Sequence, residues 1–212
     1  NSQFDLIIHD ECHSITNKTS KEFYKYVHTH WTNVRCIGFT ATPELEFPYN
    51  SIISKYTIFD AFIDKIIVPP KIIWYNGKRN NNDIITAVKQ ELYKMPYQKV
   101  VVWCGMIKNC YSIAELWKPY FQDFKLCIDT SMNKSNPDNV YYDYEEFYKC
   151  ESKAILFCAV KHREGSDIPN LDTCIFLDLV EIRTPRTFIQ SMGRTLRLDK
   201  SGLKQYGLII DI

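Results

Sequence analysis

The sequence predicts an α/β fold in which parallel strands are covered by helices. Short β-branched and aromatic runs recur along the 212 residues, and amphipathic segments with a helical period separate several of them. Continuous apolar strands of this kind are typical of parallel sheets that are buried on both faces. The alternation of strands and helices then favours a doubly wound sheet.

Eight apolar runs are predicted to be strands, and they cover residues 4–9, 34–39, 71–76, 98–104, 124–129, 153–159, 172–178 and 206–211. A first helix is expected over residues 19–31, with Phe23, Tyr26 and Val27 on its apolar face. Two further helices are expected over residues 83–95 and 113–121, and Pro119 interrupts the second of them.

Pro69 and Pro70 divide the chain in this prediction. Proline fixes φ and has no backbone N–H, so the pair stops a helix and disfavours a central strand. We therefore expect one lobe over residues 1–68 and a second over residues 69–212. The first lobe has two expected strands against six in the second, so we expect it to be incomplete, with its beginning upstream.

Composition narrows the class of protein. Hydrophobic residues make up 45% of the chain, which suffices for a sizeable core, and the net charge of +1 gives no general attraction to polyanions. The sequence has neither a run approaching the ~18 apolar residues of a membrane span nor a secretory signal. We expect an intracellular protein, cytoplasmic or nuclear and not secreted, whose eight cysteines are reduced. The abundance of Asn, Ile, Lys and Tyr resembles AT-rich genomes such as those of large DNA viruses, so a viral protein in a viral factory or virion is one expectation.

The residues HDECHS at positions 9–14 follow the first expected strand directly. In an open α/β sheet, ligands bind outside the carboxyl ends of the strands. There Asp10 can hold the magnesium ion of a nucleotide, and Glu11 can polarise an attacking water. Two adjacent acids are weak evidence alone, because an acidic loop after a strand is the ordinary alternative.

Three further motifs follow in order along the chain. They are GFTATP at residues 38–43, EGSDIP at 164–169 and QSMGRTLR at 190–197. On the expected helix Gln190, Arg194 and Arg197 fall at i, i+4 and i+7, so they project from one face. Two arginines on one face favour an anionic partner, although a solvated basic face is the alternative.

Together these motifs resemble those of superfamily 2 helicases and translocases. DECH is similar to motif II, TAT to motif III, VVVWCG at 100–105 to motif IV, EGSDIP to motif V and QxxGRxxR to motif VI. The resemblance covers essentially the whole chain and extends to one subgroup, the restriction-subunit-like and XPB-like DNA helicases. It implies tandem RecA-like lobes with parallel sheets, ATP and Mg²⁺ as cofactors, and nucleic acid as partner, with DNA favoured over RNA.

The resemblance also implies a role for each motif residue. Asp10 would bind Mg²⁺ through water, Glu11 would be the catalytic base, and His13 would link the nucleotide site to motif III. Motif VI would supply the remaining catalytic residues, which are Gln190, Arg194 and Arg197, the arginines acting as fingers on the transferred phosphoryl group. ATP binding and coupling would involve Thr40, Thr42, Gly165 and Asp167. The basic residues before motif V would face the nucleic-acid backbone or be a local peculiarity, and they are Lys161, His162 and Arg163.

The sequence departs from the helicase pattern at these basic residues and, more importantly, because it contains no GxxxxGK[ST] phosphate loop. We expect the remaining N-terminal part of the same protein to complete the ATP site, and this fragment alone to be inactive. An RNA helicase or duplex-RNA-stimulated ATPase is the nearest alternative. A degenerate core that clamps nucleic acid without hydrolysis is an alternative of another class. The order of the motifs argues against a metabolic α/β enzyme with a chance DECH.

Overall fold

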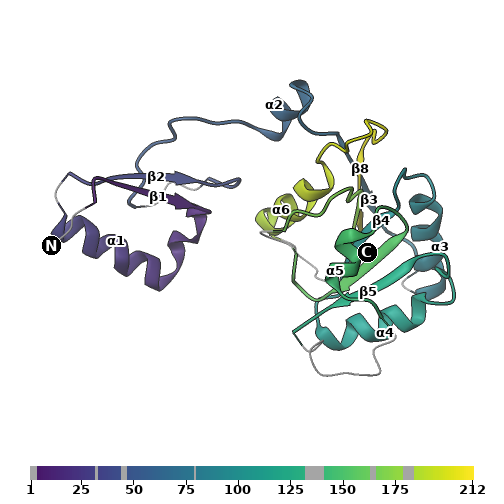
Figure 1. Ribbon diagram of the computed structural model, residues 1–212. Coiled ribbons are helices and arrows are strands. Elements are labelled where there is room, and N and C mark those ends of the chain that lie inside the picture. The colour runs from purple at the N-terminus through teal and green to yellow at the C-terminus, as the bar shows by residue number, and fades with distance from the viewer. Residues whose placement is uncertain are drawn as a thin grey trace. The chain divides into compact units, whose positions relative to one another are not determined.

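The computed structural model describes residues 4–31, 33–43, 47–78, 80–131, 141–162, 166–178 and 184–212. The chain forms two compact units, residues 1–57 and 58–212, and each is described by itself (Figure 1). This division lies ahead of the boundary at residue 69 that the two prolines predict. The assignment of residues 1–68 and 69–212 to two helicase lobes stays a prediction.

The first unit is a single β-α-β element. Strand β1 (Leu6–Asp10) pairs in parallel with β2 (Arg35–Phe39), and Asp10 lies opposite Phe39. The connection between them contains a 3-10 helix, η1 (Cys12–Thr16), and helix α1 (Lys18–His30). Parallel strands need such a crossover because a tight turn cannot join them.

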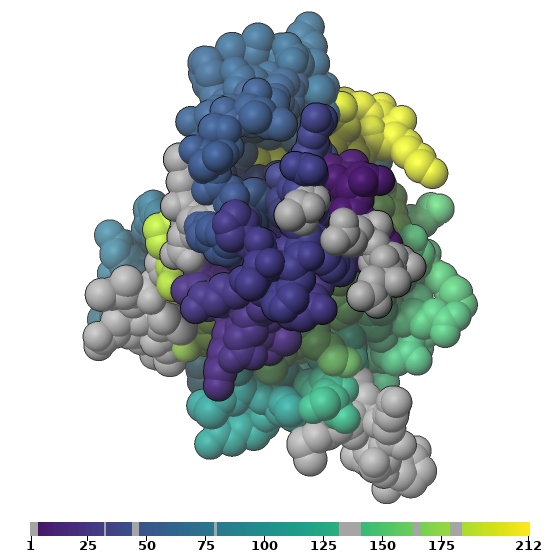
Figure 2. Space-filling view, turned by 90° about the vertical axis from the view of Figure 1, so that its left-hand side faces the viewer, coloured from purple at the N-terminus to yellow at the C-terminus, as the bar shows by residue number. Residues whose placement is uncertain are grey.

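Helix α1 packs on the sheet through a different face from the one the sequence predicts. Val27 is buried as expected, but Phe23 and Tyr26 are 46% and 53% exposed. Tyr24 is buried in their place, because the hydroxyl of Tyr49 lies 3.4 Å from its own and its ring stacks on that of His9. Figure 2 shows the surface of this unit in purple and indigo.

The second unit is built on six parallel strands. Their order in the sheet is β3-β8-β7-β4-β6-β5. Their bounds are β3 Pro70–Trp74, β4 Lys99–Trp103, β5 Lys125–Asp129, β6 Ala154–Cys158, β7 Thr173–Phe176 and β8 Gly207–Asp211. With β1 and β2, these elements confirm all eight predicted strands and the predicted α/β class. Pro70 begins β3 at the edge of the sheet, where a missing N–H leaves no central ladder bond unmade.

Five helices accompany this sheet in the described part of the chain. They are α2 Ile58–Ile63, α3 Asn81–Leu92, α4 Ile107–Trp117, α5 Tyr144–Lys149 and α6 Pro185–Thr195. The helix predicted over residues 113–121 begins earlier, at Ile107, and ends before Pro119, whose ring cannot continue a helix. Within the described ranges, no helix is both long and apolar enough to cross a membrane.

Side chains alternate across the central strand β4 and so divide the core into two layers. Val100 and Val102 belong to the layer that packs against α3 and α4, whereas Val101 and Trp103 belong to the layer that packs against α5 and α6 (Figure 1). All four side chains are fully buried. The alternation follows from the two-residue period of a strand, and it explains why this run is apolar throughout.

The cysteines are free thiols, as the sequence predicts. Six of them are buried, and the two that are partly exposed are Cys36 and Cys150. Buried thiols behave as small apolar side chains, so these residues contribute to packing.

Asp172 is a fully buried acid at the start of β7. Its carboxylate accepts hydrogen bonds from three backbone N–H groups, those of residues 97, 98 and 99, and from the hydroxyl of Thr173. Burial raises the pKa of Asp172 to about 6 and lowers the pKa of the buried Lys204 to about 8. Each charge partly offsets the effect of burial on the other, so both groups are mainly charged at pH 7.

Replacing Asp172 by Asn should lower the free energy of unfolding by about 1–3 kcal/mol. The amide NH₂ cannot accept hydrogen bonds, so one or more of the backbone N–H groups that the carboxylate binds would lose their acceptor. Urea unfolding measures the loss. The matched control is Asp123→Asn, since Asp123 is exposed and its 2.9 Å ion pair with Lys153 lies at the surface. That change should cost less than about 1 kcal/mol. Equal losses in the two variants would contradict this role for Asp172.

Gly207 begins β8 where the strand passes the end of α6. A Cβ there would meet the carbonyl group of Thr195 and lie 2.8 Å from Cδ2 of Leu196. Gly207→Ala should therefore lower the free energy of unfolding by about 1–3 kcal/mol. Gly193→Ala is the control, because no heavy atom lies within 4 Å of its added Cβ. Within a helix that change should instead raise stability by about 0.5–1 kcal/mol, and thermal unfolding of both variants checks the opposite signs.

Candidate active site

The acidic motif lies where β1 ends. Asp10 is the last residue of the strand and is exposed. Glu11 adopts the left-handed conformation, with φ 53° and ψ 48°, and turns the chain into η1. Its N–H donates to Oδ1 of Asp10 over 3.0 Å, and its side chain is 53% exposed. A non-glycine residue rarely adopts this conformation, and here it keeps both carboxylates at the surface, where a cation can reach them.

His13 joins the two strand ends of the first unit. Its Nδ1 lies 3.0 Å from Oγ1 of Thr40, which follows β2, and 3.2 Å from Oε2 of Glu11. The side chain is only 9% exposed. The loops after parallel strands leave the sheet at the same edge, and so the DECH and TAT segments come into direct contact. The roles expected for His13 and Thr40 stay predictions.

Thr40 and Thr42 are also connected to each other. The N–H of Thr42 donates to Oγ1 of Thr40 over 3.1 Å. The hydroxyl of Thr42 is buried and has no hydrogen-bond partner among the described residues. Buried hydroxyl groups are nearly always paired in folded proteins, so this oxygen is available to a further partner.

Sequence reasoning missed the residues that support this edge of the sheet. His9 lies between the hydroxyl of Tyr49, 3.0 Å from Nδ1, and that of Ser14, 3.1 Å from Nε2. Burial lowers the pKa of His9, which favours a neutral ring. A Cβ on Gly38 would lie 2.6 Å from Sγ of Cys12, so glycine is required for this close packing. Tyr49 could not be found from spacing, because it lies 40 residues from His9.

Motif VI differs from its prediction at one residue. Helix α6 ends at Thr195, so Gln190 and Arg194 lie on it and Arg197 lies beyond it. The expectation that all three project from one helix face is therefore wrong for Arg197. The backbone of Arg197 forms an isolated antiparallel β-bridge with Ile67 instead of continuing the helix. The buried ammonium of Lys204 donates to the carbonyl of Arg197 over 2.9 Å.

Both arginines contact the segment that contains motif V. Nη1 of Arg194 donates to the carbonyl of Ser166, and Nη1 of Arg197 forms an ion pair with the carboxylate of Asp167. The side chains of Arg197 and Asp167 are 50% and 81% exposed, so solvent screens that pair. Gly165, predicted to approach the ligand, lies outside the described residues.

Gln190 has an unusual environment on α6. Both polar atoms of its amide are buried, and neither has a hydrogen-bond partner in the part of the chain that the structure describes. An unpaired buried amide costs about 1–3 kcal/mol. The free donor and acceptor are suited to a polar ligand.

The basic residues before motif V have partners inside their own unit. Nζ of Lys161 lies 2.8 Å from Asp129, and Nε2 of His162 lies 2.7 Å from the same carboxylate. Burial would raise the pKa of Asp129, but hydrogen bonds from these two side chains hold it below its usual value. Arg163, the third basic residue, lies outside the described residues. Asp129 was missed, although its place at the end of β5 could have indicated it.

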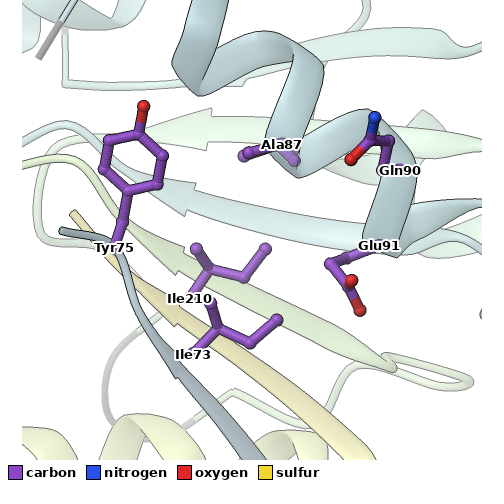
Figure 3. Close-up of a pocket in the computed structure, with 7 residues that line it drawn as sticks. Ile73, Tyr75, Ala87, Gln90, Glu91 and Ile210 are labelled. Atoms are coloured by element: carbon purple, nitrogen blue, oxygen red, sulfur yellow. The ribbon is translucent and has the colours of Figure 1, made fainter. Parts of the chain in front are cut away.

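A small pocket lies elsewhere in the second unit, between α3 and the strands β3 and β8 (Figure 3). Ile73 and Ile210 line it from the strands, and Ala87 and Glu91 line it from the helix. Lys71 and Lys94 already neutralise Glu91, at 2.8 and 2.5 Å. The pocket lining is mostly apolar and contains none of the motif residues.

Asp10 and Glu11 meet the requirements of a magnesium ion. Within the described ranges, no group of three His, Cys, Asp or Glu side chains could hold a metal ion. Mg²⁺ commonly binds through one or two carboxylates together with waters and substrate phosphates. The exposed Asp10 and Glu11 fit that requirement, whereas the phosphate loop that would hold the nucleotide is missing from the sequence.

Comparison with known structures supports the fold. A fragment assigned as an HsdR subunit of a type I restriction enzyme from Vibrio vulnificus YJ016 matches with a TM-score of 0.72 at 18% identity, over 98% of this chain and 43% of that one. The ATP-dependent type ISP restriction-modification enzyme LlaBIII bound to DNA matches with a TM-score of 0.64 at 17% identity, over 100% of this chain and 18% of that one. The chain thus spans less than half the length of these structures, and such identities show a shared fold alone.

Sequence families give a closer assignment. No match is found among curated proteins. The type III restriction enzyme res subunit family matches residues 1–45. The family described as the helicase conserved C-terminal domain matches residues 83–199, which is more than half of the chain. With its six-stranded parallel sheet and its ordered motifs, the chain belongs to the helicase conserved C-terminal domain family, within the superfamily 2 helicases.

Proposed function

We propose that this chain is part of an ATP-dependent helicase or duplex translocase that acts on nucleic acid, with DNA favoured over RNA. The observation that carries the proposal is the hydrogen bond between His13 and Thr40, 3.0 Å long. His13 also contacts the carboxylate of Glu11 at 3.2 Å, so it links the DECH segment to the TAT segment, and a change at the nucleotide would reach a second loop.

Asp10 and Glu11 divide the chemistry at the end of β1. Asp10 would hold Mg²⁺ through water, and the ion would neutralise charge on the phosphates of ATP. Glu11 would accept a proton from the attacking water, and its exposed carboxylate has room to approach one. Phosphoryl transfer needs mainly such positioning and charge neutralisation.

The two motif VI arginines would neutralise the charge that develops on the transferred phosphoryl group. Arg194 donates to the neutral carbonyl of Ser166, and Arg197 pairs with the exposed carboxylate of Asp167. An exposed ion pair is worth about 0–1 kcal/mol, so a phosphate can replace Asp167 at little cost. The unpaired amide of Gln190 would bind the same anion or its water.

The remaining parts of the ATP site would come from a longer protein. We propose that its N-terminal part supplies the phosphate loop, because the sequence has none. Preference for DNA is supported by the res subunit match at residues 1–45 and by the LlaBIII structure, which is described as bound to DNA. The missing loop also favours a second candidate, a degenerate core that clamps nucleic acid without hydrolysis.

ATP hydrolysis by the full-length protein tests the proposal. Wild type should be stimulated by duplex DNA more than by duplex RNA. Glu11→Gln and Arg197→Ala should each lower kcat by about 10²-fold or more, since they remove the base and a finger. Glu22→Gln is the control, because Glu22 is an exposed residue of α1 that lies 3.9 Å from Lys18 in a surface ion pair.

Three other outcomes would change the assignment. Stimulation by duplex RNA alone would replace DNA by RNA as the substrate. An inactive wild type that still binds nucleic acid would establish the clamp. Activity that survives Glu11→Gln would remove the DECH segment from the chemistry.

The coupling of His13 to Thr40 can be tested separately. His13→Ala and Thr40→Val should each lower kcat by about 10-fold, and the double variant should lose clearly less than the product of the two losses, because both remove the hydrogen bond between these side chains. His28→Ala is the control, since His28 lies on the exposed surface of α1. Multiplied losses in the double variant would show that the two residues act independently.

A further inference from the structure

Asp129, Tyr144, Lys161, His162 and Ser166 form one group of contacts, called here the Asp129 cluster. Its central member is His162, whose side chain is 10% exposed. Nε2 lies 2.7 Å from the carboxylate of Asp129, and Nδ1 lies 2.7 Å from Oγ of Ser166. The ring stacks on Tyr144 with centroids 4.1 Å apart and an angle of 17°. Three parts of the fold therefore hold one imidazole: the end of β5, helix α5 and Ser166 of motif V.

The backbone of His162 also indicates a specific position. Its φ is 63°, in the left-handed region that residues with a side chain rarely adopt. Asp129 stays ionised and can only accept hydrogen bonds. Nε2 of His162 therefore carries a proton, and in the neutral ring Nδ1 accepts from the hydroxyl of Ser166.

Ser166 passes this constraint to motif VI. Its hydroxyl binds His162, and its carbonyl accepts from Arg194. The next residue, Asp167, pairs with Arg197. The two arginines thus bind two consecutive residues, and the first of these, Ser166, is hydrogen-bonded to the His162 ring.

We propose that His162 is a positioning residue for the motif VI arginines, acting through Ser166 and anchored by Asp129. The inference rests on the proposed function for its effect on catalysis. The bond geometry alone carries its structural part: without the ring, residues 166 and 167 lose their link to the end of β5, and Arg194 loses a fixed acceptor. A misplacement of about 1 Å at a reacting group can cost about 10²-fold in rate.

This role differs from the contact with the nucleic-acid backbone expected for His162. Both ring nitrogens are already bonded, and the ring is nearly buried. A phosphate would have to displace an ionised carboxylate that Lys161 also binds, at 2.8 Å. The two roles predict losses in different kinetic constants.

The catalytic test uses the full-length protein with His162→Ala, Ser166→Ala and the double variant, at saturating ATP and nucleic acid. Each single variant should lower kcat by about 10-fold or more, and the double variant should lose no more than the larger single loss. KM for ATP and the nucleic-acid concentration for half-maximal stimulation should stay within about 3-fold of wild type. The control is His30→Ala, an exposed residue of α1. A loss confined to nucleic-acid affinity, or multiplied losses, would overturn the proposal.

A second measurement does not depend on ATP hydrolysis. In the 212-residue chain, the guanidinium N–H protons of Arg194 should be protected from exchange with solvent, as measured by ¹⁵N NMR. The Arg194 signals are assigned by their absence from the spectrum of Arg194→Lys. His162→Ala should abolish that protection while circular dichroism stays unchanged. If the full-length wild type does not hydrolyse ATP but His162→Ala still loses the protection of Arg194, the proposed function fails and the positioning role stands. If Arg194 stays protected in His162→Ala, the positioning is refuted whatever the activity.

Discussion

Parallel pairing of strands brings the ends of neighbouring strands to one edge of a sheet, and the candidate site depends on this constraint. Glu11 follows β1 and Thr40 follows its neighbour β2, and both side chains contact His13. In the second unit Asp129 ends β5 beside the end of β6, and His162 follows β6. Each loop would have a different neighbour if the strands were antiparallel.

Charge at these edges is arranged in two ways. The carboxylates of Asp10 and Glu11 are exposed, so a hydrated cation can approach them from solvent. Asp129 is instead held by Lys161 and His162 and keeps a lowered pKa. The first arrangement suits a ligand that comes and goes, and the second suits a fixed support. Arg197 lies between these cases, because its partner Asp167 is exposed and readily replaced.

Much of the fold could be predicted from the sequence, because its strands are short, apolar and separated by turn residues. All eight strands agree with the prediction from the sequence. Pro70 begins the edge strand β3, in agreement with the prediction that the proline pair disfavours a central strand. The buried face of α1 was not predicted, because Tyr24 is held by hydrogen bonding and stacking that helical period cannot reveal. The end of α6 was also missed. Arg197 lies outside the helix because its backbone pairs with Ile67 and accepts a hydrogen bond from Lys204. Neither of these partners belongs to motif VI.

The candidate residues were found by motif, but their partners were not. Asp129, Tyr144 and Tyr49 reach the site only through tertiary contacts, and a single sequence gives no distance between segments so far apart. The same limit explains why the sequence leaves two alternatives open for His162 and its basic neighbours, a nucleic-acid contact or a local peculiarity. Its partners, not its own residue type, indicate the positioning role.

The proposed function requires the DECH carboxylates and the motif VI arginines to act on the same nucleotide in the full-length protein. The most direct measurement is a crystal structure of the full-length protein with ADP, Mg²⁺ and aluminium fluoride, which mimics the transferred phosphoryl group. Mg²⁺ should be bound to Asp10 through water, and the guanidinium groups of Arg194 and Arg197 should contact the fluoride in place of Ser166 and Asp167. Arginines that remain on Ser166 and Asp167 with the mimic bound, or Mg²⁺ held away from Asp10, would contradict the proposed function.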